Sequence, residues 1–189
     1  MIYVSIDIET TGLDPVNDQV LQIGAIVEDT NNLLDFEDIP KFERLIRHRR
    51  ITGSPYALAM NSNLIAKLAE SDLYGISAEA AVLDLYEWLL NHLGVPLSGH
   101  RPVWAGKNVA SFDLPFLSNI SNWNQYFENS NRILDPTILF VDWQKDVRPP
   151  SLQDCLRRAG FPDNRVVTHD AVSDAWDVIC CLRKAYNNE

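Results

Sequence analysis

The sequence has few of the features that mark secreted or membrane proteins. It holds 3 cysteines, Cys155, Cys180 and Cys181, which provide neither a disulfide framework nor a Cys-x-x-Cys metal pair. Its apolar runs stay well short of the roughly 18 residues that a membrane span needs. Met1 leads directly into a short strand pattern instead of a signal peptide. We therefore expect a cytoplasmic protein with no membrane partner.

Positive charge is also scarce. Lys and Arg number 16 against 26 Asp and Glu, which gives a net charge of −10. Such a chain repels polyanions at long range, so broad electrostatic binding of duplex DNA is not expected. An acidic excess is equally compatible with a cluster of carboxylates that holds divalent cations. The positions of the carboxylates in the sequence decide whether such a cluster is expected.

The pattern of apolar residues predicts one α/β domain over residues 1–189, because no linker, composition shift or repeat divides the chain. Ile2–Ile8 alternates like a half-buried strand, and Val20–Glu28 is a continuous run of branched residues typical of a buried one. Further strands are predicted over Phe42–His48, Pro102–Ala105 and Arg132–Leu134. Helices are predicted after the cap Ser77, over Phe112–Ile120, over Leu152–Ala159 after the cap Ser151, and over Ala171–Tyr186. This order predicts a central mixed five-stranded sheet flanked by helices.

Two carboxylates end the first predicted strand. Asp7 and Glu9 are two residues apart, so they point to the same side of the strand. Their mutual repulsion and desolvation are unfavourable unless cations hold them or one carboxylate is protonated. The alternative is a strand that frays into solvent at its polar end.

Two further segments carry acidic residues beside element boundaries. Asp113 follows the strand Pro102–Ala105, at the kind of strand end where open α/β sheets build sites, although Ser111 or Asp113 can equally cap the next helix. Asp174 lies one turn into the last helix, which Asp170 is placed to cap, and its alternative role is to stabilise that helix N-terminus. His169 precedes the helix in a loop, where an imidazole is free to move.

Four carboxylates and a mobile histidine from separate elements suit phosphodiester hydrolysis. Two divalent ions, Mg²⁺ or Mn²⁺, prefer such oxygen ligands, and together they bind the attacking and leaving oxygens. The imidazole of His169 would then accept the proton of the attacking water.

These residues resemble the motifs of the DnaQ-like 3′–5′ exonucleases of the DEDDh class. The segment Asp7-Ile8-Glu9-Thr10-Thr11-Gly12-Leu13 resembles the first motif, Phe112-Asp113 the second, and His169 with Asp174 the third. Weaker similarity at Gln22–Ala25 and Ser151–Asp154 extends over nearly the whole chain. Asn108 stands five residues before Asp113 instead of four, and Gln22 replaces a frequent Glu, a change expected to have little effect.

The resemblance implies a ribonuclease H-like fold and specific roles. The metal ligands would be Asp7, Glu9, Asp113 and Asp174, with His169 as general base. Contacts to the last nucleotides are implied for Thr10, Leu13, Phe112 and Asn108. The implied activity is release of nucleoside 5′-monophosphates from the 3′ end of a single strand, with DNA slightly favoured over RNA. Association with a polymerase and the oligomeric state are left open.

Several alternatives remain at this point. The chain can be an oligoribonuclease-like RNA exonuclease, an endonuclease or strand-transfer enzyme of the same fold, or a catalytically silent binding module. The basic segment Arg47–Arg50 is interpreted as a solvated strand end in preference to a guide for nucleic acid. Asp135 is assigned to a strand end and Asp177 to a solvent-facing turn of the last helix.

Overall fold

A mixed sheet forms the centre of the computed structural model, which describes residues 1–70, 74–93, 101–128, 132–165 and 167–186. The sheet has five strands in the order β3-β2-β1-β4-β5. The strands are β1 (Ile2–Thr10), β2 (Val20–Asp29), β3 (Lys41–Leu45), β4 (Trp104–Ala105) and β5 (Ile133–Leu134). β2 pairs antiparallel to both β1 and β3, whereas β4 runs parallel to β1 and β5.

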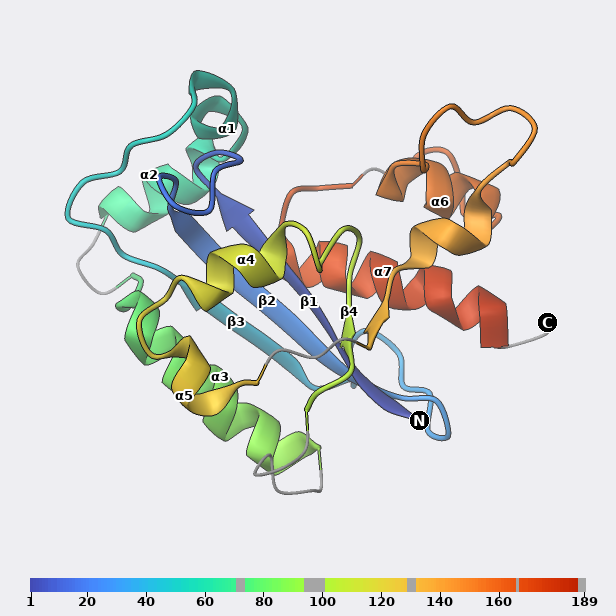
Figure 1. The fold of residues 1–189 in the computed structure, drawn as a ribbon, viewed down its shortest axis with the longest axis horizontal. Coiled ribbons are helices and arrows are strands. Elements are labelled where there is room, and N and C mark those ends of the chain that lie inside the picture. Colours follow the sequence, from blue (N-terminus) through green and yellow to red (C-terminus); the bar gives the residue numbers. More distant parts are fainter. Residues whose placement is uncertain (71–73, 94–100, 129–131, 166, 187–189) are drawn as a thin grey trace.

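Helices cover both sides of this sheet (Figure 1). The α-helices are α1 (Pro55–Met60), α2 (Ser62–Glu70), α3 (Ala78–His92), α4 (Asp113–Ser118), α5 (Trp123–Tyr126), α6 (Leu152–Arg158) and α7 (Ala171–Tyr186), and a 3-10 helix, η1, spans Pro136–Phe140. One apolar cluster joins β1 to α3 and α5, and a second joins the opposite side of the sheet to α6 and α7.

The alternation in β1 assigns its residues to these two layers. Val4, Ile6 and Ile8 belong to the cluster with α3, whereas Tyr3 belongs to the cluster with α7. Because side chains two residues apart share a face, Asp7 points to the side that α7 covers. The predicted strand thus places its acidic residues toward the N-terminal end of α7.

The first turns of α7 lie directly against the sheet. Gly24 pairs with Asp7 across β1 and β2, and a Cβ atom at Gly24 would lie 2.4 Å from the carbonyl carbon of Ala171. The Ser5 hydroxyl donates a hydrogen bond of 2.8 Å to the carbonyl oxygen of Ala175. A glycine in β2 and a hydroxyl in β1 therefore bring the start of α7 close to Asp7.

The sequence predictions agree with the architecture and miss several short elements. The predicted α/β architecture with a central mixed five-stranded sheet is confirmed, with β3 ending at Leu45 instead of His48. The last helix spans the predicted residues, and Ser77 and Ser151 cap α3 and α6. The short helices α1, α2, α5 and η1 were not predicted. Within the described parts of the chain, no helix is both long and apolar enough to cross a bilayer.

Gly24→Ala is expected to push the start of α7 away from the sheet. Overpacking of this kind costs about 1–3 kcal/mol in the free energy of unfolding. Hydrogen exchange should show faster exchange at the amides of Ser173 and Asp174, which are bonded to Asp170 in the first turn of α7. Gly160→Ala is the control, since no atom lies within 4 Å of the added Cβ and only its φ of +87° strains the chain. Unchanged exchange in Gly24→Ala would contradict this account.

Candidate active site

Asp7 and Glu9 are held at the end of β1 next to β2. Glu9 pairs with Gln22, and the register shifts between Glu9 and Thr10, where the strand ends. Glu9 is 6% exposed, so the end of the strand does not fray into solvent as the alternative interpretation required. The side chain of Asn61 donates to the Thr10 carbonyl at 3.0 Å and also bonds the Glu9 carboxylate.

Asp113 reaches the site because β4 accompanies β1 only briefly. The two strands pair at Val4 and Ser5, and beyond these residues the edge of β1 is open. The amide of Ile8 on this edge donates to Asp113 Oδ1 at 3.1 Å. No side chain caps α4 at Phe112, so the capping role considered for Asp113 is not what the structure shows. Asp113 instead bonds β1 between Asp7 and Glu9.

The N-terminal turn of α7 supplies the remaining acidic group and the imidazole. Asp170 accepts from the amide of Ser173 at 3.0 Å, which confirms its predicted capping role. Side-chain ligand atoms of Glu9, His169 and Asp174 lie within 4.8 Å of one another. His169 is exposed and has a φ of 53°, a left-handed conformation that is uncommon outside glycine. The backbone turn thus directs the imidazole toward the carboxylates.

Gln22 connects this turn to the sheet. Its Oε1 accepts from the amide of Ala171 at 3.1 Å, and its Nε2 donates to Asp170 Oδ2 at 3.0 Å and to Glu43 Oε1 at 3.0 Å. The neutral amide therefore satisfies a donor at the helix start and two acceptors at once. Gln22 therefore has a structural role that the sequence analysis did not predict.

The segment before His169 is tied to α6 and α7. Gln153 Nε2 donates to the carbonyl oxygen of Arg165 at 2.7 Å, and Gln153 Oε1 accepts from the amide of Val167 at 3.0 Å. Arg165 Nε donates to Asp177 Oδ1 at 2.9 Å. Asp177 is only 6% exposed, so its assignment to a solvent-facing turn was wrong; the segment before His169 covers that side of α7. Asp135, by contrast, ends β5 as expected and caps η1.

Burial and mutual repulsion disfavour ionisation of the four carboxylates. Burial raises the pKa of Asp7 well above its ordinary value, and Asp113, Asp174 and Glu9 raise it further. Burial together with the charge of Asp170 raises the pKa of Glu9 to about 7 despite the hydrogen bond from Asn61.

The other two carboxylates behave in the same way. Burial raises the pKa of Asp113 to about 7, aided by Glu9, although the Ile8 amide and Lys107 oppose the shift. For Asp174, burial followed by repulsion from Glu9 and Asp177 raises the pKa to about 7. The repulsion between Asp7 and Glu9 that the sequence analysis expected is therefore present in the structure.

This donor set fits divalent cations. Among the described residues, Asp174 Oδ1 is buried without a hydrogen-bond partner, an arrangement that costs free energy unless something binds the oxygen. Carboxylate oxygens are the ligands that Mg²⁺ and Mn²⁺ prefer. Bound cations would satisfy the unpartnered oxygen and relieve the repulsion that adds to burial in raising the four pKa values.

A pocket of about 550 Å³ opens beside these carboxylates. Asp7, Glu9, His169 and Asp174 line one part of it, and the predicted contact residues Thr10, Leu13 and Phe112 line another. Leu13 is 84% exposed at its rim. Sequence reasoning missed the wall that α1 contributes through Tyr56, Ala57, Met60 and Asn61. The dipeptide Ser54-Pro55 was the available signal, because Ser54 caps α1 and proline occupies its first turn.

Asn108 is the one predicted contact residue that lies elsewhere. It has a φ of 59°, and its amide donates to Asp135 Oδ2 at 2.9 Å. Its side chain lines a different hollow, formed with Lys107 and the segment before α6. The structure therefore separates Asn108 from Thr10, Leu13 and Phe112.

Comparison with known proteins identifies the fold and the family resemblance. Residues 4–95, just under half of the chain, match the family described as RNase_T, Exonuclease, and this stretch contains Asp7 and Glu9. No curated protein matches the chain significantly. The match and the shared fold confirm the resemblance to the DnaQ-like 3′–5′ exonucleases.

Solved structures of E. coli exonuclease I share the fold. The zinc-bound form in complex with single-stranded DNA has a TM-score of 0.69 and 17% identity, and the match covers 100% of this chain and 41% of that chain. The complex with a dA16 oligonucleotide has a TM-score of 0.70 and 18% identity over 99% of this chain and 41% of that chain. The chain thus spans about two fifths of the length of these exonuclease I chains.

The raised pKa values predict how pH affects the metal-free protein. A carboxyl group with a pKa near 7 when folded and near 4 when unfolded stabilises the fold fully below about pH 4, and this contribution is lost as pH rises through 7. Asp174→Asn removes one such group, so the variant does not lose this contribution as pH rises. The difference in melting temperature between variant and wild type should therefore increase from pH 5 to pH 8. Millimolar Mg²⁺ should stabilise wild type more at pH 8 than at pH 5, and the variant less than wild type. Equal Mg²⁺ effects at both pH values would contradict this interpretation.

Proposed function

We propose that the chain is a divalent-metal-dependent 3′–5′ exonuclease domain that releases nucleoside 5′-monophosphates from single-stranded nucleic acid, with DNA slightly favoured over RNA. The observation that carries the proposal is the convergence of Asp7, Glu9, Asp113 and Asp174 beside a nucleotide-sized pocket, with one buried carboxylate oxygen unpartnered. The exonuclease family match over residues 4–95 supports the same class of reaction.

The four carboxylates would hold two ions, Mg²⁺ or Mn²⁺. When bound, such ions polarise the scissile phosphate and stabilise the charge on the attacking and leaving oxygens. The chain's own contribution is to fix the ligands: the Ile8 amide holds Asp113, and Gln22 holds the turn that carries Asp174. Glu9 and Asp174 need little rearrangement on binding, because the fold already brings their side-chain ligand atoms within 4.8 Å of each other.

His169 would act as the general base. Its side chain lies within 4.8 Å of ligand atoms of Glu9 and Asp174 and is exposed to solvent, so it can accept the proton of an attacking water and return it to bulk water. Gln153 and the Arg165–Asp177 pair restrict the segment before it, which limits the conformations of the imidazole.

The terminal nucleotide would occupy the pocket beside β1. Leu13 and Phe112 provide apolar contact to its base and sugar, and Thr10 lines the deeper part, where the Thr10 hydroxyl donates to the Gly12 carbonyl at 2.7 Å. Tyr56, 76% exposed on α1, adds an aromatic surface on which a base can stack. The solved neighbours, whose complexes contain single-stranded DNA, support the proposed preference for DNA.

Degradation of a 5′-labelled single strand tests this function directly. With Mg²⁺, wild type should shorten linear DNA by single nucleotides and leave a circular single strand intact, because cleavage starts at a 3′ terminus. Asp7→Asn should abolish the ladder and leave the fold in place, since the change removes charge without removing volume. A cut circle indicates an endonuclease, faster digestion of very short RNA an oligoribonuclease-like enzyme, and binding without any cleavage a silent module.

His169→Ala should lower kcat by about 10²–10⁴-fold if the imidazole accepts the proton of the attacking water. His48→Ala is the matched control, because its Nε2 contacts the Val20 carbonyl oxygen at 2.6 Å and it lines a different pocket. Single-turnover rates with saturating Mg²⁺ separate chemistry from binding. A His169→Ala rate within a few fold of wild type would assign the proton transfer to another group.

A further inference from the structure

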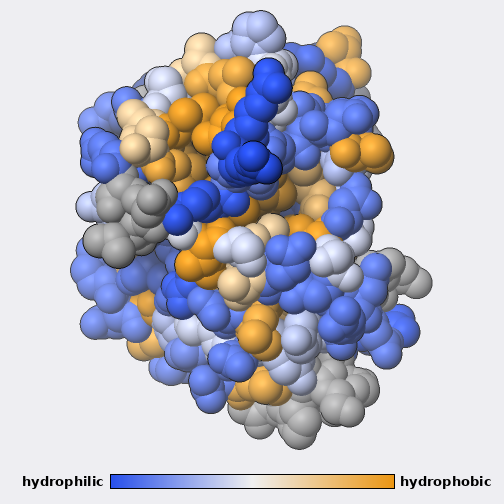
Figure 2. All heavy atoms as spheres, turned by 90° about the vertical axis from the view of Figure 1, so that its left-hand side faces the viewer, coloured by the Kyte–Doolittle hydropathy of each residue, from blue (hydrophilic) through white to orange (hydrophobic). Residues whose placement is uncertain are grey.

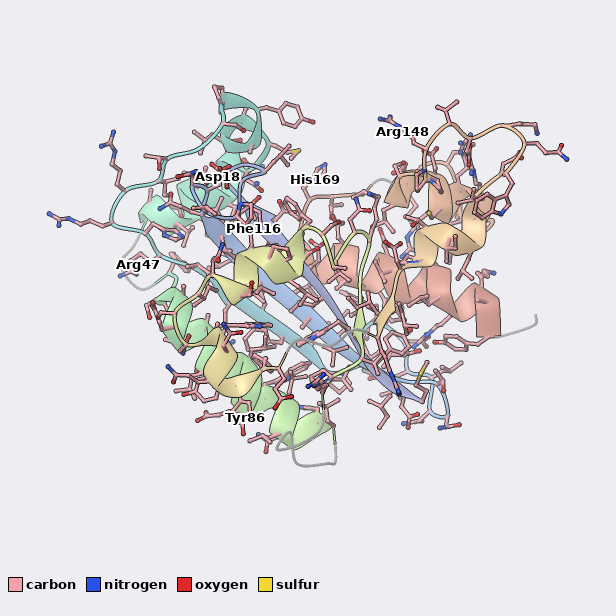
Figure 3. The ribbon with its side chains drawn as sticks, viewed as in Figure 1. Asp18, Arg47, Tyr86, Phe116, Arg148 and His169 are labelled. Carbon is pink, nitrogen blue, oxygen red and sulfur yellow. The ribbon has the colours of Figure 1, made fainter. Side chains whose placement is uncertain are left out.

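A second hollow leaves the acidic site on the side away from α1. A pocket of about 420 Å³ is bounded at one end by Asp7, His169 and Asp174 and at the other by Lys107 and Ser151. Lys107 and Ser151 also line a larger hollow of about 690 Å³, together with the segment that carries Lys145 and Arg148. Figure 3 shows His169 between the loop of Asp18 on one side and the segment of Arg148 on the other. We call the two connected hollows the basic groove.

Away from Asp7 and Asp174 of the acidic site, the charges in the basic groove are positive on balance, because the larger hollow carries four cationic side chains and two carboxylates. Both of these carboxylates are already paired, Asp146 with Arg158 and Asp154 with Arg157 at 2.8 Å. In the described parts of the chain, neither Lys107 nor Arg148 forms an ion pair with a carboxylate.

Lys145 adds a third cation to the groove. It reaches Asp142 at 3.2 Å, but it is 82% exposed, and exposed pairs of this kind are weak. In a chain with a net charge of −10, this groove is a local site for anions.

The segment that carries Arg148 is held in place. Asp146 accepts from the Asp142 amide at 2.9 Å, and Arg158 donates to the Phe140 carbonyl at 2.6 Å, so α6 anchors its beginning. Its end is Pro149-Pro150, whose rings fix φ, followed by the cap Ser151 of α6. The restricted backbone reduces the entropy lost when the arginine binds a ligand.

We propose that the basic groove binds the phosphates of the nucleotides that precede the cleaved one, and that Lys107, Lys145 and Arg148 contact them. This inference rests on the proposed function. A strand with its terminal nucleotide against Leu13 and Phe112 has its scissile phosphate at the carboxylates. The groove begins at these same carboxylates and offers ammonium and guanidinium groups that pair with phosphate oxygens. The position of Asn108 in this groove explains why it lies apart from the other predicted contacts.

The opposite edge of the molecule is the competing path for the strand. It carries Arg49 and Arg50 after β3, and its surface is largely hydrophilic with apolar groups between (Figure 2). The loop between β1 and β2 is fastened to this edge, because Gln19 bonds both the Arg50 carbonyl at 3.1 Å and the Thr52 amide at 2.9 Å. The hollow on this side shares Asp18 with the pocket but none of the site carboxylates, whereas the basic groove is lined by Asp7, His169 and Asp174.

Two double variants with the same change in charge test the proposal. Lys145→Gln/Arg148→Gln removes two cations from the groove, and Arg49→Gln/Arg50→Gln removes two from the opposite edge. Each is assayed on a long oligothymidylate and on the p-nitrophenyl ester of thymidine 5′-monophosphate, which has no preceding phosphate. Neither substitution touches the acidic site, and melting temperatures confirm that both variants fold.

The groove variant should raise KM for the oligothymidylate roughly tenfold or more and leave kcat and the ester kinetics unchanged. Its plot of log KM against log salt should be shallower by about 1.4, which is roughly sevenfold less loss of affinity between 50 and 200 mM salt. The edge variant should match wild type on both substrates.

The other outcomes overturn the proposal. If wild type cleaves both substrates and the groove variant has the same KM and salt dependence, only this proposal is wrong. If the edge variant alone shows the effect, the strand crosses the opposite edge. If the groove variant also slows the ester, its residues act on the acidic site instead. If wild type cleaves neither substrate, the proposed function itself fails and this inference fails with it.

Discussion

Repulsion between buried carboxylates is the constraint around which this protein is organised. Asp7, Glu9, Asp113 and Asp174 stand where burial and their neighbours oppose ionisation, so other contacts must hold them together. Those contacts are polar bonds to rigid backbone at the end of β1 and the start of α7, together with the absence of a side chain at one position of β2. Folding therefore keeps an unfavourable arrangement in place, and binding of cations would relieve it.

Much of this arrangement was predictable because the relevant signals are local. Alternation in β1 places Asp7 and Glu9 on one face, whichever strands lie beside it. The long apolar stripe and the cap of α7 define that helix, and they place Asp174 in its first turn. That these segments meet came from the resemblance between motifs, since nothing in their local sequence specifies the pairing of β1 with β4 or the position of α4.

The features that the sequence did not reveal depend on contacts between residues that are far apart in the chain. Asp177 reads as a surface residue on a helical wheel, yet Arg165 and the segment before His169 bury it. The local sequence around Gln22 does not show that its amide bonds both β3 and α7. Asn108 and Asp113 belong to one short segment, but Asn108 is left-handed and lines the hollow before α6, whereas Asp113 is buried against β1.

The amide of Gln153 shows that different parts of the fold position the imidazole and the carboxylates. Gln153 belongs to α6, which provides none of the site carboxylates. Its side chain nevertheless forms hydrogen bonds with the backbone of Arg165 and Val167, just before His169. The imidazole of His169 is thus coupled to a peripheral helix, while the carboxylates are coupled to the sheet. A substitution in α6 can therefore shift the imidazole and leave the positions of the carboxylates unchanged.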